Sequence, residues 1–201
     1  MTDSSVPNPD LYVFSLFLYG MKSDCYFVFL RGINVGGNKK VPMTELKRLL
    51  ERNGYNGVET LLNSGNIVLY SNESNSEQIE KALEPLLETH FGFSIPVIVR
   101  KAEEIQTLYA QAPFKEISIT KNTRLYISML QTDVTSELQL PWVSEDGSYS
   151  ILKKNGKDII SVLELGTTKS TDAMKILEQQ YGKAITTRNW NTIEKMIQKL
   201  P

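Results

Sequence analysis

The sequence predicts an α+β fold of two ferredoxin-like subdomains, with mostly antiparallel sheets and a helix at the C-terminal end. Two observations lead to this prediction. Between residues 25 and 99, apolar runs and helical stripes follow the order β-α-β-β-α-β, which is the ferredoxin-like split βαβ order. Between residues 125 and 200, a similar order returns with a shorter first helix and one trailing helix.

The first unit begins with a strand. Residues 25–30 (CYFVFL) are wholly apolar, which is typical of a buried central strand. Pro42 suits the first turn of a helix, and Gly54 suits its end. The turn 63–66 (NSGN) between two apolar runs indicates a hairpin. The expected elements are therefore strand 25–30, helix 42–53, strands 58–62 and 67–70, helix 79–91, strand 95–99 and helix 102–110.

The second unit follows Ala112-Pro113-Phe114, which marks the expected boundary. Asn155-Gly156, between two apolar runs, is the strongest short hairpin signal. The expected elements are strand 125–129, a short helix 133–140, strands 149–152 and 159–163, a helix around 174–181, a short strand 184–186 and a final helix 190–200. We expect subdomains at 25–112 and 113–201, preceded by an N-terminal extension at 1–24.

Composition narrows the possible classes of function. The 201 residues are 41% apolar and 22% charged, which is ordinary for a globular protein, and the net charge of −1 disfavours a dedicated nucleic-acid domain. The chain has one cysteine, which excludes an intrachain disulfide. Together with a single histidine, it leaves too few nitrogen and sulfur ligands for a typical zinc site. We expect no metal, no cofactor and a reducing, cytoplasmic location.

The N-terminal residues include an apolar run at 11–20 (LYVFSLFLYG). This run is shorter than a membrane helix, and no lysine or arginine precedes it as in a secretory signal. We therefore expect no membrane association. Met1 and Met21 both remain open as the native start.

A glycine-rich loop at 31–40 (RGINVGGNKK) is the strongest candidate site. A strand that runs through such a loop into a helix can direct backbone N–H groups at an anion. The loop is not a nucleotide-binding P-loop, because Asn38 replaces the required lysine and Lys39 replaces the serine or threonine. The dinucleotide-binding pattern is also absent.

Topology connects this loop with the NSGN turn. The first strand of a ferredoxin-like sheet pairs antiparallel with the third and fourth, so its end lies beside the start of the third. Arg31, Asn34, Ser64 and Asn66 should then lie within reach of one ligand. The alternative is that the glycines only allow positive φ and the asparagines only bond local backbone.

A second polar cluster lies at 186–192 (TTRNWNT), before the last expected helix. Arg188 is a bidentate donor there, and anions are stabilised near helix N-termini. The alternative is a capped helix with Trp190 in the core and Arg188 in a salt bridge. The sequence predicts no catalytic residue, and the candidate ligand-binding residues are Arg31, Gly32, Asn34, Gly36, Gly37, Ser64, Gly65, Asn66, Arg188 and Asn189.

Three ordered motifs carry a family resemblance: 30–37 (LRGINVGG) before Val41, Met43 and Leu46, then 64–66 (SGN), then 187–192 (TRNWNT). With these motifs, the chain resembles the uncharacterised bacterial domain-of-unknown-function 1697 family from about residue 26 onwards. The resemblance implies two ferredoxin-like subdomains and supplies no reaction.

The function therefore stays unknown, and our best hypothesis is a cytosolic binding module for a small anion with a phosphate or carboxylate group. An enzyme on the same edge is an alternative, although neither motif holds a titrating acid or base. An RNA-binding module is another, because Phe27 and Phe29 share one face of a strand. A protein-interaction domain is the fourth, and the oligomeric state is open.

Overall fold

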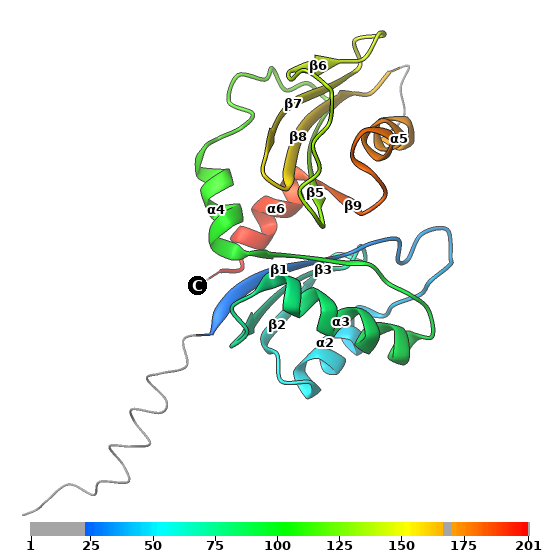
Figure 1. Ribbon diagram of the computed structural model, residues 1–201, viewed down its shortest axis with the longest axis vertical. Coiled ribbons are helices and arrows are strands. Elements are labelled where there is room, and N and C mark those ends of the chain that lie inside the picture. Colours follow the sequence, from blue (N-terminus) through cyan, green and yellow to red (C-terminus); the bar gives the residue numbers. More distant parts are fainter. Residues whose placement is uncertain (1–22, 167–169, 201) are drawn as a thin grey trace, which may run out of the picture.

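Four antiparallel strands form the first sheet, in the order β2-β3-β1-β4 (Figure 1). The computed structural model describes residues 23–166 and 170–200, so most of the expected extension 1–24 lies outside the described residues. The central strand β1 pairs with both β3 and β4, as its wholly apolar sequence predicts. The elements are β1 (Asp24–Leu30), α2 (Met43–Arg52), β2 (Asn56–Leu61), β3 (Asn66–Ser71), α3 (Ser76–Phe91) and β4 (Val97–Lys101).

The two faces of β1 serve different cores. Side chains alternate along a strand, so Tyr26 and Val28 point to one face and Phe27 and Phe29 to the other. The first face is covered by α2 and α3, whose apolar stripes complete one core. The second face packs toward the C-terminal half of the chain.

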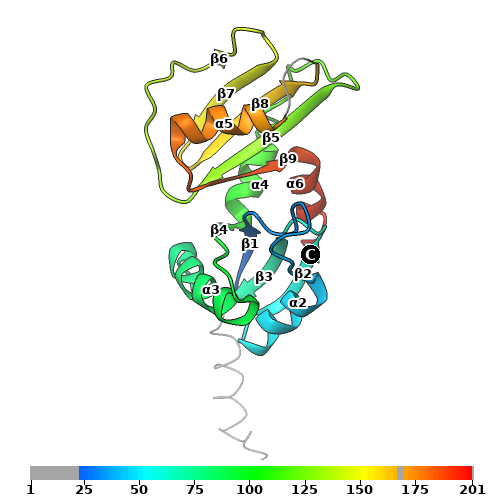
Figure 2. The same cartoon turned by 90° about the vertical axis from the view of Figure 1, so that its right-hand side faces the viewer.

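Five antiparallel strands form the second sheet, in the order β6-β7-β8-β5-β9. Its outer face is covered by the helix α5, which packs on β5, β7, β8 and β9 through a third core (Figure 2). The elements are β5 (Thr123–Leu130), β6 (Trp142–Val143), β7 (Tyr149–Asn155), β8 (Asp158–Glu164), α5 (Ser170–Tyr181) and β9 (Ile185–Asn189).

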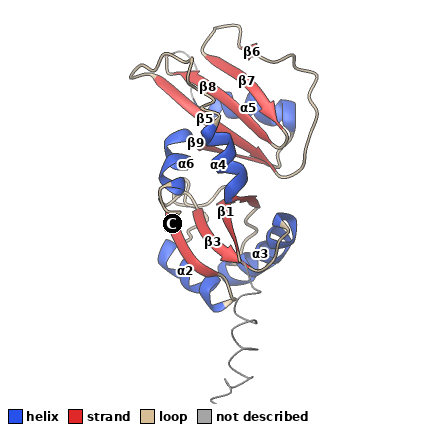
Figure 3. Ribbon diagram, turned by 90° about the vertical axis from the view of Figure 1, so that its left-hand side faces the viewer, coloured by secondary structure: helices blue, strands red, loops and turns tan. Residues whose placement is uncertain are grey.

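Two helices lie between the sheets: α4 (Ala102–Ala110) and α6 (Trp190–Ile197) (Figure 3). Each begins directly after a strand, α4 after β4 and α6 after β9. Their apolar side chains share one core with Phe27 and Phe29 of the first sheet and Ile127 and Met129 of the second. The layers are thus helices, sheet, helices, sheet and helix. Mixed α+β structure with antiparallel sheets and a C-terminal helix is confirmed.

One expected element is wrong, and another is too short. Residues 133–140 form no helix, because Val134, Leu138 and Leu140 reach the third core from irregular backbone, and tertiary burial outweighs local helical spacing. The last strand extends beyond 184–186 to Asn189, because β9 pairs with β5 along its whole length. Arg188 therefore lies within a strand rather than in a loop.

Candidate functional site

The glycine-rich loop and the NSGN turn meet at one end of β1. The backbone N–H of Leu30 donates to the carbonyl oxygen of Gly65 at 2.8 Å. The turn approaches so closely that a Cβ on Gly65 would lie 2.7 Å from the Leu30 Cβ. The predicted contact between the loop and the turn is confirmed, and we call this loop and turn (residues 31–40 and 62–66) the rim.

Asn34 holds the loop in shape. Its Nδ2 donates to the carbonyl of Val41 at 3.0 Å and to that of Asn63 at 2.8 Å, and its Oδ1 accepts from the Val41 N–H at 2.8 Å. The side-chain amide is thus fully used inside the protein. This geometry matches the structural alternative for Asn34.

The tip of the loop is open to solvent. Val35 and Asn38 form an isolated bridge around Gly36 and Gly37, whose φ angles of 58° and 80° suit glycine. Gly32 has a φ of 71° and is also exposed. In the described part of the chain, no hydrogen bond engages the amides of Gly36 and Gly37. These N–H groups can donate hydrogen bonds to an anion without breaking an internal bond.

Arg31 joins the rim to the second half of the chain. Its guanidinium donates to the carboxylate of Glu178, near the end of α5, and to the carbonyl oxygen of Lys183. The Arg31 side chain is 31% exposed and that of Glu178 is 34% exposed. Arg31 is therefore an accessible cation that already holds a carboxylate.

Arg188 also reaches the rim, but from inside the protein. It is 9% exposed, and it donates to Asn66 Oδ1 and to the carbonyl oxygens of Leu30 (2.6 Å) and Ser64 (3.2 Å). The expected salt bridge is absent among the described residues, since the acceptors are neutral. Burial lowers the pKa of the guanidinium to about 10, which still leaves it charged at neutral pH.

The remaining candidates support these groups. Asn66 is fully buried and donates to Ser64 Oγ at 2.9 Å. Asn189 is the N-cap of α6, where its Oδ1 accepts from the Asn191 N–H at 3.0 Å. The structure thus gathers nine of the ten candidates around the rim and assigns Asn189 to the helix. Among these nine, Arg31 is partly exposed, Gly32, Gly36 and Gly37 are exposed, and Ser64 is exposed while its Oγ accepts from Asn66.

Several features of the rim were not found from the sequence. Of the four described non-glycine residues with positive φ, three lie here: Asn34, Lys39 and Leu62. Val35 and Leu62 are also 68% and 54% exposed. No sequence signal predicts a left-handed leucine, and Glu178 was missed because it comes from the far half of the chain.

Three other kinds of site were considered: an RNA-binding aromatic face, a metal site and a membrane-spanning helix. Phe27 and Phe29 share one face of β1 as predicted, but both are fully buried beneath α4 and α6, so they cannot stack on RNA bases. Within residues 23–166 and 170–200, no cluster of three or more histidine, cysteine or acidic side chains could hold a metal ion. None of the described helices combines the length and apolarity needed to cross a membrane.

Comparison with known proteins identifies a family without a known activity. No curated protein matches the chain. Among solved structures, conserved bacterial protein SP0830 from Streptococcus pneumoniae is similar, with 25% identity and a TM-score of 0.66 over 89% of this chain and 99% of that one. The family model described as "Protein of unknown function (DUF1697)" matches residues 24–157, and the chain therefore belongs to this family.

Proposed function

We propose that this protein is a binding module for a small anion that bears a phosphate or carboxylate group, bound at the rim. The observation that carries the proposal is the pair between Arg31 and Glu178. A partly exposed guanidinium holds a carboxylate there, in the donor geometry that suits ligand carboxylates and phosphates. A ligand would take the place of the Glu178 carboxylate on Arg31.

The loop supplies further positive potential. Gly36 and Gly37 present amides at its tip that no hydrogen bond from the described residues engages, and Lys39 and Lys40 add two positive charges. We assign Arg31, Gly32, Gly36 and Gly37 to ligand contact. We assign support of the rim to Asn34, Ser64, Gly65, Asn66 and Arg188, whereas Asn189 caps α6.

Backbone strain at the rim also supports a functional role. A non-glycine residue in the left-handed region costs about 1 kcal/mol or more, and such residues cluster at ligand sites. Lys39 and Leu62 adopt φ angles of 47° and 58° on the two segments that meet here. Leu62 lies in the turn between β2 and β3, and Lys39 lies in the glycine-rich loop.

Thermal shift with inorganic phosphate, citrate and AMP tests the proposal. We expect a concentration-dependent rise in the Tm of the wild type with at least one of them. Arg31→Gln should abolish this rise, and Glu178→Gln should enlarge it because the competing carboxylate is gone. Arg52→Gln, which removes an exposed charge at the far end of α2, is the matched control and should behave as the wild type. If no anion raises the Tm, or Arg31→Gln responds like the wild type, the proposal fails.

We also propose that residues 25–112 and 113–201 are two ferredoxin-like subdomains of a cytoplasmic protein. The strand order of the first sheet supports this, because β3 lies between β1 and β2 as in a split βαβ unit. The second half has a similar path with a two-residue strand, β6, in place of the first helix. The scarcity of cysteine supports a reducing compartment.

A further inference from the structure

We infer that the two halves of the chain are pseudo-equivalent units docked by a reciprocal pair of buried arginines, Arg188 and Arg100. Each arginine comes from the last strand of its own half and binds the other half. We call Arg188 with its acceptors the first clasp, and Arg100 with its acceptors the second clasp. This inference does not depend on anion binding at the rim.

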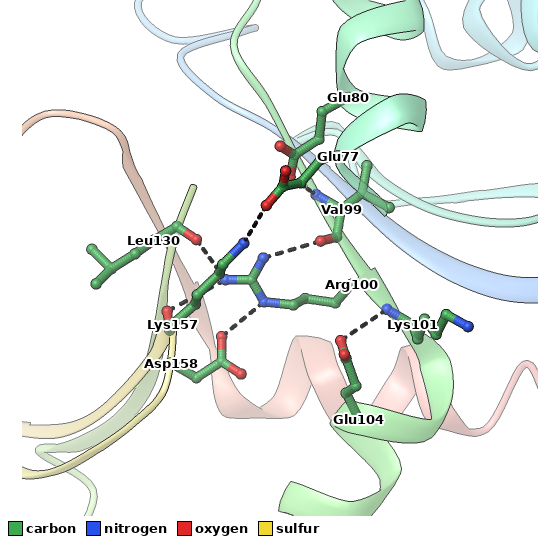
Figure 4. A network of polar contacts seen from close by, with 9 residues as sticks. All are labelled: Glu77, Glu80, Val99, Arg100, Lys101, Glu104, Leu130, Lys157 and Asp158. Atoms are coloured by element: carbon green, nitrogen blue, oxygen red, sulfur yellow. Dashed lines mark hydrogen bonds and ion pairs between the residues drawn. The ribbon is translucent and has the colours of Figure 1, made fainter. Parts of the chain in front are cut away.

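The second clasp is shown in Figure 4. Arg100 lies on β4, is 5% exposed and extends across to the second sheet. Its Nε donates to Asp158 Oδ1 at 3.1 Å, and its Nη2 donates to the carbonyl oxygens of Leu130 (2.6 Å) and Lys157 (3.3 Å). The acceptors are the end of β5, the turn before β8 and the first residue of β8.

The first clasp repeats most of this pattern, with one additional bond from Arg188 Nη1 to Thr186 Oγ1 at 2.7 Å. Arg188 Nη2 donates to Leu30 at the end of β1, also at 2.6 Å, and to Ser64 in the turn before β3. Its Nε donates to Asn66, the first residue of β3. In both clasps Nη1 donates to the carbonyl of the preceding residue, which is Thr187 at 2.9 Å for Arg188 and Val99 at 3.0 Å for Arg100.

The ends of the two first strands match as well. Leu30 donates to Gly65 at 2.8 Å, and Leu130 donates to Lys157 at 2.8 Å. The next residue in each half contacts a glutamate on the helix that precedes the last strand of the other half. Arg31 contacts Glu178 on α5, and Gln131 contacts Glu84 on α3 at 3.4 Å.

The helices that follow the two arginines, α4 after Arg100 and α6 after Arg188, are equivalent as well. Arg100 and Arg188 are each followed, at identical spacing, by three buried residues that line the core between the sheets. These residues are Ala102, Ile105 and Leu108 on α4, and Trp190, Ile193 and Met196 on α6.

Reciprocal contact of this kind is typical of a two-fold axis, because the arginine of each unit contacts the equivalent residues of the other unit. Here both units belong to one chain. Arg188 therefore has a counterpart whose role is to dock the halves, which explains why it is saturated rather than open to a ligand. The first half has Arg31 after β1 where the second has Gln131 after β5, so these equivalent positions differ in charge.

Hydrogen exchange of two equivalent amides, those of Leu30 and Leu130, tests the inference. Arg188→Lys keeps the charge but loses the forked donors, and we expect it to speed exchange at Leu30 at least tenfold while leaving Leu130 unchanged. Arg100→Lys should do the reverse. Arg124→Lys is the control, because among the described residues Arg124 donates to the carbonyls of Lys121 and Thr123 in its own segment, and it should change neither amide.

Two results would overturn the inference. One is faster exchange in the half that carries the substituted arginine. The other is an equal change at Leu30 and Leu130 in both variants, which would assign the arginines to global stability alone. Lysine is chosen over an apolar residue so that the variants fold.

Discussion

Gly65 is the residue on which the contact between the turn and the glycine-rich loop depends. Its φ of 71° disfavours other residues, and a Cβ would lie 2.7 Å from Leu30 and 2.8 Å from Ile33. Gly36 has a similar φ of 58°, but nothing lies within 4 Å of the position its Cβ would take. A comparison of substitutions at the two glycines therefore distinguishes the cost of backbone strain, which both share, from the cost of steric overlap, which arises only at Gly65.

We predict that Gly65→Ala destabilises the protein more than Gly36→Ala. Both variants bear the strain of a left-handed alanine, about 1 kcal/mol. Gly65→Ala adds the cost of overpacking, roughly 1–3 kcal/mol, since Leu30 and Ile33 must move. Urea unfolding monitored by circular dichroism measures both. Equal losses in the two variants would show that the turn does not pack on the loop as described.

Asn34 gives a second prediction at this scale. Asn34→Gly keeps the positive φ but removes three hydrogen bonds, so we expect a loss of about 1–3 kcal/mol of unfolding free energy. Asn38→Ala, in the same loop and exposed, is the control and should cost under about 0.5 kcal/mol. Urea unfolding should separate the two variants, and similar losses would contradict the role of Asn34.

At the scale of elements, α3 is fixed to β4 by a buried carboxylate. Glu80 is 5% exposed, and its Oε1 accepts the Val99 N–H at 2.8 Å. Burial raises the pKa of this carboxyl, although the Val99 hydrogen bond and Arg100 act in the opposite direction. The folded protein therefore binds a proton at Glu80 more readily than the unfolded chain.

This shift predicts a pH dependence. A pKa raised in the folded state gives stability that is present below the unfolded pKa and is lost as the pH rises through the folded value. Glu80→Gln keeps an acceptor for Val99 and does not titrate, so we expect its Tm relative to wild type to be higher at about pH 7 than at about pH 4. Glu88→Gln, exposed on the same helix, is the control. A relative Tm that is constant with pH would contradict the prediction.

Most elements of the fold could be predicted from the sequence, because apolar periodicity is a local signal. The hairpin turns at 63–66 and 155–156 were found from their own residues. The segment 133–140 was not, because its packing partners lie in distant strands. The end of β9 was missed for a similar reason, since pairing with β5 extends a strand that its own sequence presents as polar.

For the whole molecule, the orientation of the halves determines what each arginine does. Strand order predicted that the loop and the turn meet, because antiparallel neighbours place those connections at one edge. The sequence could not predict that Glu178 would sit on Arg31, 147 residues away, or that Arg188 would be buried. Those facts follow from docking of the halves, for which no local pattern exists.

The two clasps differ in charge, which gives a prediction for the whole protein. Arg100→Met removes the partner of the Asp158 carboxylate, whose side chain is only 15% exposed, so we expect a loss of about 3 kcal/mol. Arg188→Met removes a buried charge that faces only neutral acceptors among the described residues, so we expect a smaller loss of roughly 1–3 kcal/mol. Urea unfolding of both variants measures the difference. A greater loss in Arg188→Met would contradict the assigned acceptors.

The rim as an anion site is tested most directly by NMR titration of the ¹⁵N-labelled protein with inorganic phosphate and with citrate. We predict saturable shifts of the Arg31 Nε–Hε signal and of the Gly36 and Gly37 amides, with Arg188 Nε–Hε unchanged because it is buried in its clasp. Signals that move elsewhere, or that do not saturate, would contradict the account.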